Sequence, residues 1–498
     1  MRLIIGWLWK RKFLPWPCPG TDCPGLFSSI YAERVMQMSE ATEQQRLLGL
    51  NPASLYKDIW KLSWPVMLGT GLHMGFNLAD VAWISRLGAL QVAIPALAGS
   101  VLWLFMSLSE AISIGTVAMI SRFEGAGKRG LMSHVVIHSF WLSLAMAAVV
   151  GGLGVIFAEP LLLLFTDDLV TLAGAVPYMQ ITAAGLVFTF ATVSISASLN
   201  GIGDTKTPML VMMGTNALNI ILDPLFIFGW LGFPALGVQG AAWATFISNA
   251  ISVVILLFLL FRRRELNVRS LLAPFNFSIV NNILGIGIPA CLQSAARSAT
   301  GTVMFWLVMN GYGPAAGAAF GAGQRIVGLI FVFLSGLSVA ATTLIGQILG
   351  LGDKSLAMLA SRRLIILGIW VQVAIGFAYI VLASPVTRLL LADDPQALAS
   401  GISYVRIIGI GLMLGASTGV VGGVFKGAGY TMPTFVAGTV ANWLIKIPIA
   451  MAGSLWLNWP VEAIWWAISL SVVVEWWLLF VWLRRGSWLE REIVVQSA

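Results

Sequence analysis

Charged residues are scarce in this sequence. Lys, Arg, Asp and Glu make up only 10% of its 498 residues, whereas hydrophobic residues make up 58%. Soluble domains usually carry about a quarter of charged residues, so this composition excludes an ordinary soluble protein. The mean hydropathy of +0.89 instead predicts an integral membrane protein.

Cysteine and histidine are also rare, with three of each. Three cysteines exclude a disulfide framework, and the loosely metal-like pair Cys18 and Cys23 has no second ligand pair after it. His134 and His138 lie four residues apart, but no third ligand is near them in the sequence. We therefore expect no metal site, no cofactor and no enzymatic activity.

Long uncharged stretches are what the sequence does contain. Residues 139–158 and 236–261 carry no charge, and about 20 apolar residues suffice for a helix to cross the hydrocarbon core. We predict an all-α membrane protein with twelve transmembrane helices. They lie near residues 60–84, 90–118, 133–157, 170–198, 208–230, 236–261, 279–309, 315–347, 360–383, 397–424, 433–457 and 461–482.

Three motifs occur twice along the chain. LLFTDD (163–168) returns as LLLADD (389–394), GAGKR (125–129) as GLGDK (350–354), and NGIGDTKTP (200–208) as KGAGYTMP (426–433). Six predicted helices per copy give both copies the same orientation, so we predict a parallel repeat of two six-helix lobes. The N-lobe covers 51–264 (helices 1–6), and the C-lobe covers 265–498 (helices 7–12) with a short C-terminal tail. Repeats of this kind typically build alternating-access transporters.

The distribution of charge predicts the orientation. Basic residues gather in one set of connections: Arg122, Lys128, Arg129, Lys206, Arg262, Arg263, Arg264, Arg269, Lys354, Arg362, Arg363, Lys426, Arg484 and Arg485. The opposite connections hold Arg86, Arg388 and the aspartates of LLFTDD and LLLADD. The positive-inside rule places the basic set and both termini in the cytoplasm, in a multi-pass inner (plasma) membrane protein. The net charge of +8 therefore indicates topology rather than nucleic-acid binding.

Residues 1–50 differ from the rest. The apolar stretch 3–9 is too short for a signal-peptide core, and no small-residue cleavage site follows it. Met36 precedes a polar segment and is an alternative start. We expect a poorly structured N-terminal leader.

A polar stripe is predicted on the first span. His73, Asn77 and Asp80 are spaced by four and three residues, which places them on one helical face. Ionisable groups at membrane depth are costly and are usually functional. The alternative is that Asp80 only forms a hydrogen bond to a neighbouring helix.

A second stripe lies on the fifth span. Asn216, Asn219 and Asp223 share a face, and Pro224 frees the carbonyl oxygen of Ile220 because proline has no N–H. Carboxylate, carboxamide and carbonyl oxygens suit a small hard cation, or a carboxylate pair that shares one proton. The two stripes together favour function over simple helix packing.

Other ionisable residues at membrane depth are harder to interpret. Glu110 on the second span could extend a proton path or line a wet cavity. Arg297, Lys446 and Glu475 are buried charges of the C-lobe. Since Lys446 and Glu475 lie near the middle of consecutive antiparallel spans, we predict that they form an ion pair. The alternative is that Lys446 faces the substrate, as its repeat counterpart Asp223 would.

The sequence resembles the multidrug and toxic compound extrusion (MATE) transporters over about residues 55–485. The resemblance lies in NLADVAWISRLGA around Asp80, in VAMISRFEGAGK, and above all in NGIGDTKTPMLVMMGTNALNIILDPLFIFGWLGFPALGVQGAAWATFIS (200–248). It implies two six-helix lobes, and export coupled to inward flow of protons or sodium ions. The wider group is the multidrug/oligosaccharidyl-lipid/polysaccharide flippase superfamily.

The resemblance also implies roles for particular residues. Asp80, Asn219 and Asp223 match the coupling site of archaeal-type members, and Thr245 matches its sixth-span threonine. Ser196 falls where a fourth-span asparagine is expected. Another branch uses acidic residues on the seventh and tenth spans, where this sequence has none, so that second site is expected to be absent.

The sequence thus predicts a secondary antiporter that exports organic, cationic amphiphiles in exchange for protons or sodium ions. Its expected partners are small-molecule substrates and the lipid bilayer, without nucleic acid or nucleotide, and we expect it to work as a monomer. The alternatives are a lipid-linked saccharide flippase or an organic-anion exporter of the same superfamily. A membrane enzyme ranks last because no nucleophile or metal constellation lies in the spans.

Overall fold

The computed structural model describes residues 52–262, 275–391 and 394–493. In these ranges the chain is helical, and no β-strand occurs in them. The leader, Asp393 and the basic residues Arg263, Arg264 and Arg269 lie outside the described residues. The predicted all-α membrane fold is confirmed for the part of the chain that is described.

The N-lobe is built from long helices joined by tight turns. They are α3 (Leu55–Ser85), α4 (Ala89–Gly125), α5 (Arg129–Ile156), the short α6 (Ala158–Leu163), α7 (Leu169–Ile202), α8 (Lys206–Phe228) and α9 (Val238–Phe261). A 3₁₀ turn, Trp230–Gly232, links α8 to α9.

The C-lobe is less regular. It contains α10 (Phe277–Gly328), α11 (Ile330–Gly350), α12 (Lys354–Leu391), α13 (Pro395–Leu414), α14 (Thr418–Gly427), α15 (Met432–Thr439), α16 (Ile447–Met451) and α17 (Val461–Arg485). Two π-helical segments, Val440–Lys446 and Ala452–Trp456, flank α16, and a 3₁₀ turn, Ser487–Leu489, follows α17. π-Helical turns are rare and often occur at functional positions.

Ten segments of the described residues are long and apolar enough to cross a membrane. One of them, Phe277–Gly350, spans 74 residues and covers two predicted spans, because α10 breaks at Gly313, where φ is 85°. The first predicted span corresponds to α3, which is not among the ten. Its charged and polar side chains, Asp80 among them, lower its hydropathy.

The repeated motifs are helix ends. Asp168 caps α7 by accepting hydrogen bonds from the N–H groups of Val170 and Thr171, both at 3.2 Å. These bonds, and one from the Thr171 hydroxyl, hold the pKa of Asp168 below its usual value. In the second copy Asp394 caps α13 in the same way. Each LLxxDD motif therefore starts a helix.

The glycine motifs close turns and permit close packing, as expected. Gly203 and Gly429 adopt positive φ values of 98° and 71° after α7 and α14. A Cβ on Gly427 would lie 2.4 Å from the carbonyl oxygen of Thr342, so only glycine permits that approach of α14 to α11. These glycines have a structural role in turns and helix packing.

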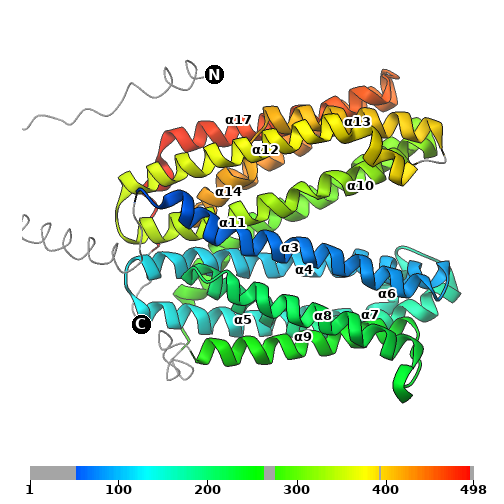
Figure 1. The fold of residues 1–498 in the computed structure, drawn as a ribbon, viewed down its shortest axis with the longest axis horizontal. Coiled ribbons are helices and arrows are strands. Elements are labelled where there is room, and N and C mark those ends of the chain that lie inside the picture. Colours follow the sequence, from blue (N-terminus) through cyan, green and yellow to red (C-terminus); the bar gives the residue numbers. More distant parts are fainter. Residues whose placement is uncertain (1–51, 263–274, 392–393, 494–498) are drawn as a thin grey trace, which may run out of the picture.

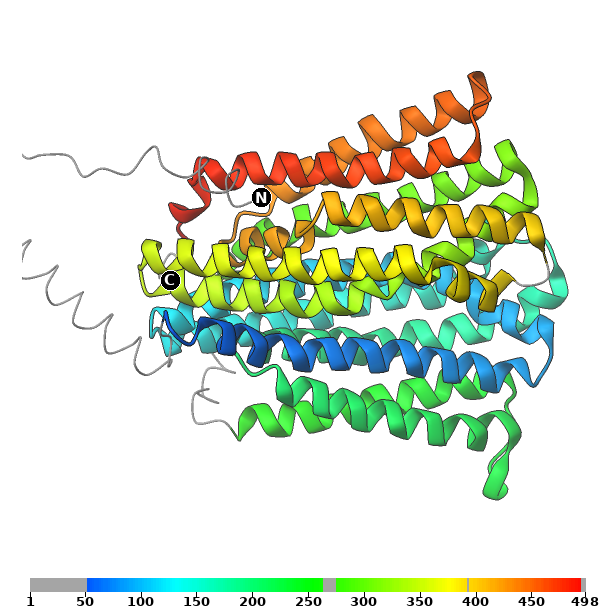
Figure 2. The same cartoon turned by 45° about the horizontal axis from the view of Figure 1, so that its top comes forward.

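The helices run along the long axis of the molecule, and α3–α9 form one group beside α10–α17 (Figures 1 and 2). We call the helix ends that carry Arg122, Lys128, Lys354 and Arg484 the basic end. The opposite end, with Asp168 and Asp394, is the acidic end.

Among the described residues, the two lobes share hydrophobic cores only toward the basic end. There, one cluster joins Leu55 and Ile59 of α3 to Ile345 of α11, and another joins Phe123 of α4 to Ile283 of α10. Toward the acidic end the described residues form a separate cluster in each lobe. The described lobes are therefore packed together at the basic end and independent at the acidic end.

Candidate functional site

The two polar stripes of the N-lobe meet at one cavity of about 250 Å³. His73, Asn77 and Asp80 reach it from α3, and Asn216 and Asn219 reach it from α8. The helical spacing that placed each stripe on one face is thus the reason why the five side chains converge.

Asn219 connects Asp80 to α9. In the amide orientation that satisfies both its groups, Nδ2 donates to Asp80 Oδ1 at 3.1 Å and Oδ1 accepts from the Thr245 N–H at 3.2 Å. The reverse orientation keeps only a 3.4 Å contact to the Thr245 hydroxyl. That hydroxyl donates to the carbonyl oxygen of Ala241 at 3.0 Å. Thr245 therefore engages Asn219 through its backbone, while its side chain lines the cavity.

Asp223 lies behind Asp80 and does not line the cavity. It is 1% exposed, it lies within electrostatic range of Asp80, and neither of its carboxyl oxygens has a hydrogen-bond partner among the described residues. A buried carboxylate without a hydrogen-bond partner is costly, and a second carboxylate close to it adds to the cost, so a proton on one of the two is favoured. The pair is therefore suited to hold one proton, with Asp80 toward the cavity and Asp223 in the interior.

Sequence reasoning missed several residues of this site. Tyr178 of α7 lies within electrostatic range of both Asp80 and Asp223. Thr189 of α7 and Asn249 of α9 line the cavity and are joined by a 3.2 Å hydrogen bond. Uncharged polar residues are common in membrane helices, so no sequence signal separates these three from the rest.

Two predicted secondary residues lie elsewhere. Ser196 is on α7 but does not line the cavity, whereas Thr182 and Thr189 of the same helix do. Glu110 of α4 accepts a 2.7 Å hydrogen bond from Ser294 of α10. Glu110 therefore contacts the C-lobe and is not among the residues that line the cavity.

His138 has a structural role. Its Nδ1 lies 2.7 Å from the carbonyl oxygen of His134, and its Nε2 accepts the backbone N–H of Asn276 at 2.8 Å. Asn276 is the N-cap of α10, so His138 holds the first residue of that helix against α5. No metal-binding group of three or more His, Cys, Asp or Glu occurs among the described residues.

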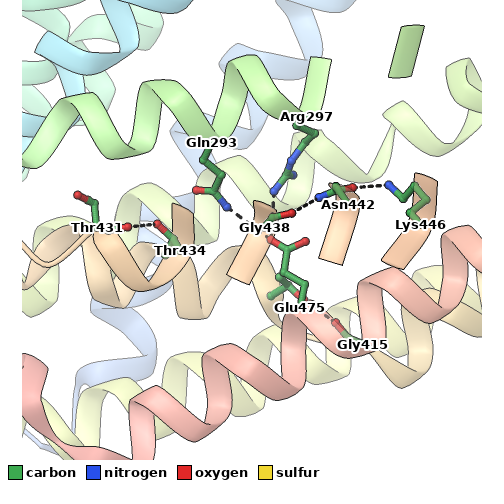
Figure 3. Close-up of polar contacts among 10 residues, drawn as sticks. Gln293, Arg297, Gly415, Thr431, Thr434, Gly438, Asn442, Lys446 and Glu475 are labelled. Atoms are coloured by element: carbon green, nitrogen blue, oxygen red, sulfur yellow. Dashed lines mark hydrogen bonds and ion pairs between the residues drawn. The ribbon is translucent and has the colours of Figure 1, made fainter. Parts of the chain in front are cut away.

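The C-lobe charges form one cluster, but the predicted pairing is wrong (Figure 3). Glu475 of α17 pairs with Arg297 of α10 at 3.4 Å and accepts a 3.5 Å hydrogen bond from Gln293. Lys446 instead donates to Asn442 Oδ1 at 2.5 Å. Lys446 and Asn442 belong to the same π-helical segment, so this bond holds the amine on its own helix.

Two basic residues at membrane depth were not singled out from the sequence. Arg325 of α10 is exposed and is the only charged residue that lines a second cavity of about 460 Å³, among Phe305, Met309 and small residues. Arg406 of α13 is also exposed. Both lie as single charges inside largely apolar helices, without the stripe of polar neighbours that marks Asp80 and Asp223 in the sequence.

Comparison with known proteins identifies the family. The sequence pattern of the MatE family matches residues 65–225 and 289–452, which is most of both lobes.

The chain belongs to the MatE family.

Relatives and solved structures of MATE transporters match this chain over most of its length. The probable multidrug resistance protein NorM of Thermotoga maritima is 29% identical over 446 residues, covering 89% of this chain and 95% of that protein. The FAD transporter of Shewanella oneidensis is 27% identical over 368 residues, covering 72% and 79%. A crystal structure of MATE in complex with MaL6 has a TM-score of 0.81 at 25% identity, covering 88% and 98%.

The protein is therefore a multi-pass integral membrane transporter of the MATE type, and not an enzyme. Its homologues support export of small-molecule drugs. The roles of Asp80, Asn219, Asp223 and Thr245 in coupling remain predictions.

Proposed function

We propose that this MATE transporter is a secondary antiporter that exports organic, cationic amphiphiles in exchange for protons. It works as a monomer in the inner membrane, with both termini and the basic end in the cytoplasm. The observation that carries the proposal is the Asp80–Asp223 pair: Asp80 lines the cavity, and the buried Asp223 has no hydrogen-bond partner for either carboxyl oxygen among the described residues.

The arrangement supports a simple exchange cycle. Ionised Asp80 attracts a cationic substrate into the N-lobe cavity, where Phe76 and Phe246 offer apolar walls. A proton that enters from the acidic end neutralises Asp80 and weakens that attraction. The differential affinity for the two protonation states then drives release.

The described conformation fits the release step. Shared cores close the basic end, while the lobes are separate at the acidic end. With the basic end in the cytoplasm, this arrangement faces outward. Rocking of the lobes about the midplane would then return the site to the cytoplasm.

Reconstituted liposomes test the proposal. Uptake of a cationic dye is measured with a pH gradient alone and then with a sodium gradient alone. We expect the pH gradient to drive transport and the sodium gradient to have no effect. Transport under the sodium gradient alone would show that the carboxylate pair binds Na⁺ instead, and transport under neither would contradict ion-coupled antiport.

A second candidate, organic-anion export, has its own support. The described C-lobe spans carry more basic than acidic residues, and one relative is named an FAD transporter. The same liposomes distinguish the two functions when the cationic dye is replaced by an anionic one.

A further inference from the structure

Charge is divided unequally between the two lobes. In the described membrane helices of the N-lobe the mid-span charges are the carboxyl groups of Asp80, Glu110 and Asp223. The corresponding depth of the C-lobe holds one carboxylate, Glu475, and several cations. These cations are Arg297, Arg325, Arg406 and Lys446, and Lys426 follows at the last turn of α14, nearer the basic end.

The polar cluster around Glu475 has a surplus of positive charge. Lys426 lies within electrostatic range of Glu110, and Arg297 pairs with Glu475. Lys446 lies within range of Glu475 and Arg297. Three cations thus face two carboxylates, and the remaining positive charge is expensive at membrane depth unless an anion or water meets it.

The cluster also has unused hydrogen-bond donors. Arg297 can donate five hydrogen bonds, and Glu475 is its one partner among the described residues; Lys446 can donate three and uses one, to Asn442. Asn442 is itself fixed, because its Nδ2 donates to the carbonyl oxygen of Gly438 at 2.7 Å. The Lys446 amine is therefore held in place with donors to spare (Figure 3).

Part of the Arg297 side chain is exposed. Its side chain is 47% exposed, whereas that of Glu475 is 9% exposed. Ser294, one turn earlier on α10, contacts Glu110 of the N-lobe, so this face of the helix is turned toward the other lobe. An arginine exposed to lipid at this depth would be costly, which indicates that the free part of the guanidinium meets the space between the lobes.

From these observations we propose that Arg297 and Lys446 form a C-lobe subsite that binds an anionic group of the transported compound, a carboxylate or a phosphate. The proposal rests on the export function proposed above and narrows its substrates to amphiphiles that carry an anionic group beside their cation. Such a zwitterion satisfies both lobes, with its cation near Asp80 and its anion near Lys446. Asn442 positions Lys446, and Glu475 positions Arg297.

Two matched ligand pairs test the subsite by binding to purified protein in detergent. A fluoroquinolone and its methyl ester differ by one carboxylate, and flavin mononucleotide and riboflavin differ by one phosphate. We expect the wild type to prefer the member that carries the carboxylate or phosphate in at least one pair, by about tenfold or more, as for hydrogen bonds to charged groups. The preferred pair tells which anionic group is bound, and no preference in either pair overturns the proposal.

Substitutions of Lys446 test whether this residue causes the preference for the anionic group. Lys446→Gln removes the charge but can still donate to Asn442, so it should remove the preference and leave affinity for the member without the anionic group unchanged. Lys446→Arg should retain the preference, and Lys354→Gln, the same charge change at the exposed basic end, should not alter it. A preference that persists in Lys446→Gln contradicts the assignment.

The experiment separates the subsite from the export function. Binding is measured without a gradient, whereas export is measured in liposomes. Loss of the preference in a Lys446→Gln variant that still exports the methyl ester under a pH gradient supports the subsite. A wild type that shows the preference but transports nothing contradicts the export proposal alone.

Discussion

One substitution at Asp80 separates the shape of the side chain from its ability to bind a proton. Asp80→Asn keeps the shape, and its amide can still bond to Asn219 after a flip, but it cannot bind or release a proton. We expect the variant to fold and to lose pH-driven export to background. Size-exclusion chromatography checks that the variant folds, and liposome transport measures its export. Export at the wild-type rate would contradict a coupling role.

Asp223 should act with Asp80 as one unit. Because Asp223 lies within electrostatic range of Asp80 and has no side-chain hydrogen-bond partner among the described residues, removal of either carboxyl should already destroy the proton site. We expect the double variant Asp80→Asn/Asp223→Asn to transport no worse than the more impaired single variant. A double variant whose loss is the product of the two single losses would show that the carboxylates act independently.

At the scale of elements, glycines determine how closely the lobes pack. A Cβ on Gly287 of α10 would lie 1.8 Å from the carbonyl oxygen of Ala111 on α4, whereas Gly285 has nothing within 4 Å. We expect Gly287→Ala to destabilise the protein by about 1–3 kcal/mol through overpacking. Gly285→Ala is the matched control and should be neutral or slightly stabilising. Equal melting temperatures for the two variants in detergent would contradict this account of the contact.

At the scale of the whole molecule, the orientation of the protein in the membrane can be tested by labelling. In a background with Cys18, Cys23 and Cys291 replaced, Thr166→Cys places a thiol at the acidic end and Lys354→Cys places one at the basic end. We expect a membrane-impermeant maleimide to label only the first in intact cells, because the positive-inside rule keeps the basic end in the cytoplasm. Labelling of Lys354→Cys alone would mean that the orientation is reversed.

Much of the architecture followed from local patterns. Apolar stretches predicted the helices, and the spacing of His73, Asn77 and Asp80 predicted one polar face, because both depend on helical periodicity alone. The repeated motifs predicted two equivalent lobes. They are helix caps and turns, such as those at Asp168 and Gly203, so each is determined by residues close in sequence.

Pairing across helices was decided only by the tertiary structure. Lys446 and Glu475 lie at similar depth, yet Glu475 pairs with Arg297, because α10 brings a guanidinium to it while Asn442 holds the lysine on its own helix. In the same way, the place of Asp223 behind Asp80, and of Tyr178 near both, depends on how α3, α7 and α8 pack. Depth and helical face can be read along one chain segment, but the partner of a side chain depends on the rotation and contact of two helices, which no single segment encodes.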